Sequence, residues 1–136
     1  MTRTGAVGMA LAWALSSVCM PGFAQPCAGM DKVLTDTKRA EYAPLVAATF
    51  GPTVSAKQVE ILRVLESGTW SAVEAATPVA DIGTFFFEAS QGRKRLRVVW
   101  GGWADASERP QLVGWARKQG VPESLARCFA AFETAR

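Results

Sequence analysis

Histidine is absent from the 136-residue chain. This side chain is the most frequent general base and a frequent metal ligand, so its absence excludes the usual catalytic triads and most zinc sites. The sequence also lacks the glycine patterns of a P-loop or a dinucleotide site and the carboxylate spacing of a calcium loop. We therefore expect no catalytic residue, no cofactor and no metal, and we favour a binding protein over an enzyme.

The sequence also lacks an apolar run of the ~20 residues that a membrane-spanning helix needs. Near the N-terminus, Arg3 precedes an apolar stretch of about 13 residues, and small residues follow up to Ala24. This pattern predicts a cleaved secretory signal peptide over residues 1–24 and a single domain over residues 25–136. An uncleaved membrane anchor, or a lipid anchor on Cys19, is the alternative. We expect a periplasmic or secreted protein that contacts the membrane only through its signal peptide.

Cysteine is scarce, with three residues, of which Cys19 lies inside the predicted signal peptide. Cys27 and Cys128 remain in a chain addressed to an oxidising compartment, and they lack the Cys-x-x-Cys spacing of a redox pair. We predict a structural disulfide between them. It closes a loop of about 100 residues, for which the chain-entropy model gives about 4.7 kcal/mol of stabilisation.

A large excess of either charge is missing too. Removal of Arg3 with the signal peptide leaves 14 basic residues against 12 acidic ones, so the sequence favours no nucleic acid partner. The positive charge is concentrated in the segment 93–97, which reads Arg-Lys-Arg-Leu-Arg. This segment is either a docking patch for an acidic protein surface or polyanion, or a solvated hairpin edge paired with Glu74 and Glu88.

Hydrophobic patterns predict helices at both ends of the domain and strands between them. Residues 31–50 favour a helix with Asp31 as its N-cap, and Pro44 must kink it or start a second helix. Residues 57–66 fit a strand, which we favour, or a helix that starts with a capping box at Ser55. Further strands are expected over 70–76, 84–90 and 94–100, and two helices that begin at Ser107 and Pro122.

The two-residue loop Gln91-Gly92 sets the expected register of the last hairpin. It pairs Ser90 with Arg93, Phe87 with Leu96, Phe86 with Arg97 and Phe85 with Val98. One face of the sheet then carries Phe85, Phe87, Leu96 and Val98, and the other carries Trp70, Glu74, Phe86, Glu88, Arg95 and Arg97. Lys94 is the exception, because it joins the apolar face at the end of its strand, where we expect it to reach water.

Together these patterns predict an α+β fold in two layers. It contains an antiparallel meander of three to four strands, an N-terminal helix and two C-terminal helices. Leu125, Cys128, Phe129 and Phe132 follow the spacing of a buried helical stripe. The predicted disulfide then joins the start of the first helix to the last helix.

Tryptophan and arginine supply the candidate partner surface, because both residue types are enriched at binding hot spots. The segment Trp100-Gly101-Gly102-Trp103 forms a corner that presents an aromatic ring. The sheet face with Trp70 is an apolar and cationic surface if the C-terminal helices leave it uncovered. The candidate surface consists of Trp70, Phe86, Arg95, Arg97, Trp100 and Trp103.

We expect a small exported interaction protein of the bacterial envelope, such as an inhibitor or an immunity-type binder of another envelope protein. The alternative is a small-ligand or glycan-binding module in which Phe85, Phe87 and Trp100 line an apolar cavity between sheet and helices. A hydrolase that uses Glu74 and Glu88 as paired carboxylates is less favoured. The sequence sets no oligomeric state.

Overall fold

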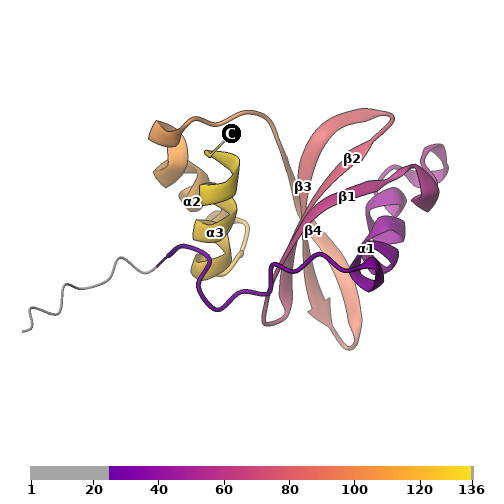
Figure 1. Ribbon diagram of the computed structural model, residues 1–136, viewed down its shortest axis with the longest axis horizontal. Helices are drawn as coiled ribbons and strands as arrows, with labels where there is room; N and C mark the ends of the chain where they lie inside the picture. The colour runs from indigo at the N-terminus through magenta and orange to yellow at the C-terminus, as the bar shows by residue number, and fades with distance from the viewer. Residues whose placement is uncertain (1–24, 136) are drawn as a thin grey trace, which may run out of the picture.

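The computed structural model describes residues 25–135, in which one antiparallel sheet lies between helices (Figure 1). The predicted meander, with its N-terminal helix, two C-terminal helices and Cys27–Cys128 disulfide, is confirmed, whereas the predicted signal peptide falls outside the described residues. In chain order the elements are α1 (Asp36–Ala48), η1 (Gly51–Thr53), η2 (Ala56–Gln58), β1 (Glu60–Ser67), β2 (Trp70–Thr77), β3 (Ala80–Ser90), β4 (Arg93–Gly101), η3 (Ala106–Glu108), α2 (Arg109–Lys118) and α3 (Glu123–Glu133).

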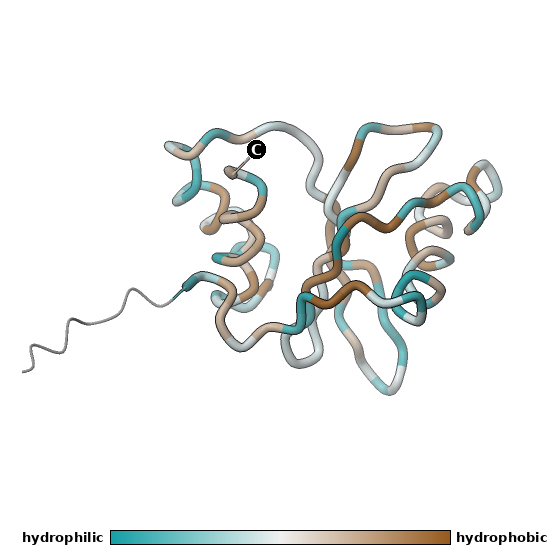
Figure 2. The backbone as a smooth tube through the Cα atoms, in the orientation of Figure 1, coloured by the Kyte–Doolittle hydropathy of each residue, from teal (hydrophilic) through white to brown (hydrophobic). Residues whose placement is uncertain are grey.

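The helices cover both faces of the sheet, so the described fold has three layers and the expectation of two was wrong (Figure 1). The physical reason is the run Phe85-Phe86-Phe87 in β3. Successive side chains of a strand point to opposite faces, so three consecutive phenylalanines make both faces apolar. Phe85 and Phe87 are buried under α1, and Phe86 is buried under α2 and α3. Figure 2 shows the hydrophobic residues gathered where the strands cross the centre of the molecule.

The first helix starts later than predicted. Thr35 is its N-cap and accepts a hydrogen bond from the backbone N–H of Lys38. Asp31 instead exchanges backbone hydrogen bonds with Glu66 of β1. The helix then continues through Pro44 to Ala48, so no second helix begins at the proline.

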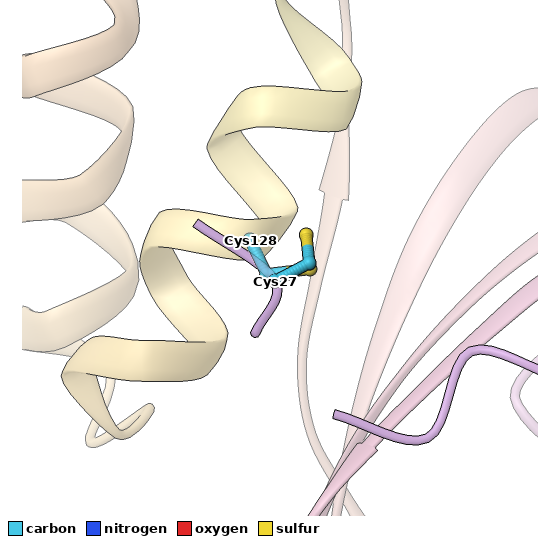
Figure 3. The surroundings of a disulfide bond; sticks show 2 residues. All are labelled: Cys27 and Cys128. Atoms are coloured by element: carbon cyan, nitrogen blue, oxygen red, sulfur yellow. A yellow bond between two sulfur atoms is a disulfide. The ribbon is translucent and has the colours of Figure 1, made fainter. Parts of the chain in front are cut away.

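Residues 25–35, here called the strap, run from α3 past the edge of β1 to α1 (Figure 1). Figure 3 shows the disulfide on the side of α3 that faces the sheet. The Cα atoms of Cys27 and Cys128 are 4.7 Å apart. The bond therefore fixes the strap to α3, and not the start of α1 as expected, because α1 lies on the other face of the sheet.

The register of β3 and β4 was predicted correctly from Ser90–Arg93 to Phe87–Leu96 and wrongly beyond that point. A β-bulge at Arg97 makes Phe86 pair with Val98 and Phe85 with Val99. Opposite the fully buried Phe86, the Arg97 guanidinium would have to enter the core. The bulge places Val98 there and leaves Arg97 exposed.

Three smaller predictions also differ, in part or wholly, from the structure. The capping box between Ser55 and Gln58 and the strand β1 both form, so residues 57–66 contain a short 3-10 turn followed by a strand. Asp105, and not Ser107, caps the turn that leads into α2. Lys94 does not extend into water: its ammonium donates to the Tyr42 hydroxyl at 2.8 Å and to Glu41 at 2.6 Å.

Candidate binding site

The C-terminal helices cover two of the residues assigned to the candidate partner surface. Trp70 is 8% exposed and Phe86 is fully buried, both in the core between the sheet and α2–α3. Trp70 and Phe86 therefore do not belong to an exposed partner surface. Arg95 and Arg97 remain exposed on β4, Trp100 is half-buried and Trp103 is 78% exposed.

Trp100 and Trp103 meet a third tryptophan, Trp115 of α2, in a surface groove of about 230 Å³. The groove is lined by Trp100, Trp103, Ala104, Glu108, Gln111, Leu112 and Trp115. We call it the tryptophan groove. The helical spacing places Trp115 on the core-facing stripe of α2. Trp115 lies at the margin of that stripe, and this position indicates that its ring also reaches the surface.

Local structure explains why the three rings converge. Trp100 lies near the end of β4, and the chain then turns at Gly102, whose φ of 144° favours glycine. The turn brings Trp103 toward α2. In the next segment Glu108, Gln111 and Trp115 follow one another at spacings of three and four, which places them on one side of the helix.

Two of the three tryptophans are held rigidly by the core. The ring centroid of Phe129 lies 5.5 Å from that of Trp100 and 6.3 Å from that of Trp115. Trp115 also meets Phe86 edge-on at 6.1 Å. The groove therefore has a fixed aromatic floor, and Trp103 stands beside it as an exposed aromatic wall.

Polar groups at the rim of the groove are also oriented. A carboxylate oxygen of Glu108 accepts the backbone N–H of Asp105 at 3.0 Å. The hydrogen bond from the Ser107 side chain holds the pKa of Asp105 below its ordinary value. Gln111 adds an amide with both donor and acceptor atoms. The groove can thus offer stacking surfaces together with hydrogen-bonding groups.

Arg95 and Arg97 precede Trp100 along β4 and lie on the side of the sheet that α2 and α3 cover. Both neighbour Glu88, since Arg95 is its partner in the register and Arg97 forms an ion pair with it at 3.4 Å. Glu88 in turn lies opposite Trp70 of the same face. Cationic side chains therefore flank the tryptophan groove along the strand that leads into it.

The structure does not bring together the two carboxylates considered for a hydrolase. Glu74 lies opposite Thr84 and Glu88 lies opposite Trp70, so four residues separate them along the sheet. At ~3.4 Å per residue this is about 14 Å, beyond the ~5–10 Å over which paired carboxylates cleave glycosides. Glu74 is also buried and forms an ion pair with Arg63 at 2.9 Å.

Glu74 instead shares a buried polar cluster with Glu133 of α3, a residue that the sequence reasoning missed. Thr84 donates a hydrogen bond to Glu133 at 3.0 Å, and the guanidinium of Arg63 lies 4.0 Å from the ring centre of Phe132. Burial raises the pKa of Glu133, while Thr84 and Arg63 oppose the change. The cluster encloses only about 10 Å³, room for one water molecule. We regard it as structural.

The apolar cavity expected between sheet and helices does not form from the residues proposed for it. Phe85 and Phe87 pack beneath α1, whereas Trp100 packs against the α3 side of the sheet. A larger groove of about 680 Å³ lies between the strap, α2 and α3. Its arginines already have partners, since Arg109 donates to Thr134 and Arg127 to Glu123, both at 2.8 Å. The tryptophan groove is smaller, but three aromatic rings line it.

These features define the described chain as a disulfide-closed α+β domain with an aromatic surface groove. No protein-family model, curated protein or solved structure matches it. Within residues 25–135, no group of three or more acidic, histidine or cysteine side chains is placed to hold a metal ion. None of the helices in that range has the length and apolar character needed to cross a membrane.

Proposed function

We propose that this protein is exported and acts by binding another protein of the cell envelope through the tryptophan groove and the flanking Arg95 and Arg97. The observation that carries the proposal is Trp103, which is 78% exposed next to two tryptophans that the core holds in place. Covering an apolar ring that is exposed to water is favourable, so a partner that packs on Trp103 gains free energy.

The magnitude supports a role in binding. If a partner covers about 150 Å² of the exposed Trp103 ring at about 25 cal/mol per Å², burial contributes about 4 kcal/mol before the costs of association. This is the contribution of a hot-spot residue. Because Trp100 and Trp115 are already fixed against Phe129, little side-chain entropy is lost when a partner packs on them.

Export is supported by the N-terminal sequence pattern and by the disulfide, which is stable in an oxidising compartment. The test is mass spectrometry of the protein recovered from the periplasm or the medium of expressing cells. We expect a chain that begins at Gln25 and carries an intact Cys27–Cys128 bond. A full-length chain with free thiols in the cytoplasmic fraction would contradict export.

The partner is tested by photo-crosslinking in living cells, with a benzophenone amino acid placed at Trp103. The matched control carries the same group at Val33, which is 66% exposed in the strap. We expect one protein adduct from position 103 that is absent from position 33. No adduct at 103, or the same adducts at both positions, would contradict the proposal.

Glycan binding at the same groove is the second candidate, favoured by Glu108 and Gln111 at the rim of the aromatic floor. Aromatic rings stack on sugar rings while such polar groups bond the hydroxyls. Titration with soluble peptidoglycan fragments, followed by tryptophan fluorescence, distinguishes the two. A saturable change that Trp103→Ala removes and Val33→Ala retains would favour the glycan.

A further inference from the structure

The outer edge of β4 is a second surface that the fold leaves open. β4 pairs with β3 on one side, and no other described segment pairs with it on the other side. The opposite edge of the sheet, at β1, is partly covered by the strap through the hydrogen bonds between Asp31 and Glu66. Apart from the bulge at Arg97, β4 therefore presents along its nine residues a row of backbone N–H and C=O groups to which another strand can pair.

The side chains of β4 form two chemically different rows beside this edge. On the α1 side, Leu96 and Val99 lie opposite the core residues Phe87 and Phe85, yet they are 40% and 39% exposed. On the α2–α3 side, Arg93, Arg95 and Arg97 are exposed. The edge is thus apolar toward one face of the sheet and cationic toward the other.

The charge of the second row is only partly compensated. Arg97 forms an ion pair with Glu88, whereas the one lysine of β4, Lys94, lies on the α1 side and is bound by Glu41. Arg93 and Arg95 make no ion pair within residues 25–135. Like charges placed directly opposite one another destabilise strand pairing, and opposite charges stabilise it. The row therefore disfavours a second copy of β4 and favours an acidic strand.

We propose that β4 binds an extended segment of a partner protein as a fifth strand, and that this segment alternates acidic and apolar side chains. Strand side chains alternate with period two, and the bulge at Arg97 brings Leu96 and Val99, three residues apart, to the same face. Such a segment, with one residue opposite the bulge, places its acidic row beside Arg93 and Arg95 and its apolar row beside Leu96 and Val99. The inference deepens the proposed function, on which it rests, by giving the chemistry of the protein that binds.

The same cations also have a protective effect, since charged edge strands resist pairing between copies of one protein. The two effects are compatible. An edge that repels its own copies and presents Leu96 and Val99 on the other side selects strands of opposite charge.

The test uses the purified, oxidised protein and a blocked synthetic peptide of four Glu-Val repeats. Binding is measured by fluorescence anisotropy, and the site is mapped from amide chemical shifts of the ¹⁵N-labelled protein. We expect the largest shifts in β4, including Leu96 and Val99. Raising the salt concentration should weaken binding, because the contacts between charges are exposed.

Two peptides and two variants serve as controls. A peptide of four Lys-Val repeats, and one with four glutamates followed by four valines, should bind about tenfold more weakly or not at all. The double variant Arg93→Glu with Arg95→Glu should weaken binding of the Glu-Val peptide about tenfold or more. The double variant Lys57→Glu with Lys118→Glu carries the same change in net charge at exposed sites outside β4 and should bind like wild type.

Equal binding of the block peptide, equal weakening by the Lys57/Lys118 variant, or shifts centred on Trp103 would each overturn the strand-addition proposal. Chemical shifts of the unliganded variants verify that they are folded. A crosslinked adduct at position 103 without peptide binding at β4 would refute only the strand addition. Peptide binding at β4 without that adduct would refute the tryptophan groove as the partner site.

Discussion

Removal of the disulfide tests how the strap contributes to stability. The double variant Cys27→Ala with Cys128→Ala deletes the bond without placing a polar hydroxyl at position 128, which is fully buried. The bond spans a sequence separation of 101 residues, for which the entropy of loop closure gives about 4.7 kcal/mol. Removal of one native disulfide from a small domain lowers the free energy of unfolding by about 2–5 kcal/mol.

These free energies convert into a thermal shift. A domain of about 110 residues has an unfolding entropy of about 0.23 kcal/mol per kelvin near its midpoint, so each kcal/mol moves the midpoint by about 4 °C. We expect the variant to unfold about 10–20 °C below the oxidised wild type. Wild type treated with reductant should unfold near the variant, because both lose the same cross-link.

Differential scanning calorimetry and urea titration measure the effect, and amide exchange locates it. The strap is also held by the Asp31–Glu66 bridge and by Lys38, which forms an ion pair with Asp31 at 2.8 Å and donates a hydrogen bond to the Val33 carbonyl at 2.9 Å. Because the disulfide anchors the other end of the strap, the Asp31 amide should exchange faster in the variant. The variant Val33→Ala changes an exposed strap residue and keeps the disulfide, so it should unfold like wild type. Equal midpoints for the oxidised and reduced proteins would refute the reasoning.

Three further predictions concern single side chains. Burial raises the pKa of Glu133, so this group stabilises the fold at pH below its ordinary value of 4.5 and the stabilisation is lost as pH rises through the higher folded-state pKa. Urea titrations between about pH 4 and 7 should therefore show Glu133→Gln gaining stability relative to wild type as pH rises, and a constant difference would contradict this. Tyr42→Phe should lower the free energy of unfolding by about 1–3 kcal/mol, because it removes the hydroxyl that donates to Glu66 at 2.7 Å and accepts from Lys94 at 2.8 Å. An unchanged urea midpoint would show that these two hydrogen bonds do not stabilise the fold. Trp103→Ala should change stability by no more than about 0.5 kcal/mol in the same assay, because the ring is exposed; a larger loss would mean that Trp103 supports the fold.

Much of the fold could be predicted because local rules and global packing agree. The Gln91-Gly92 turn fixes the hairpin from Ser90–Arg93 onward, since a two-residue loop permits one register. The disulfide could be predicted because the expected mature chain has two cysteines and is expected in an oxidising compartment. The bulge at Arg97 could not be derived in this way, because it depends on which residue the core accepts opposite Phe86.

The candidate site was predicted less well for a related reason. Trp70 and Phe86 were grouped with Arg95 by strand periodicity, but periodicity does not say which layer covers a face. Three adjacent phenylalanines indicate two buried faces, and that signal places Phe86 in the core. Only the tertiary structure brings Trp115 next to Trp100 and Trp103, because α2 lies beyond a turn whose direction Gly102 sets.

The link between the strap and α3 also constrains the order of events during synthesis. Cys27 leaves the ribosome before any strand exists, and its partner follows 101 residues later, after all of β1 to β4 and α2. The bond therefore cannot form until the whole sheet and α2 have been synthesised. Once formed, the bond keeps the strap beside α3 even when the sheet opens, so it restrains the unfolded chain as well as the folded one.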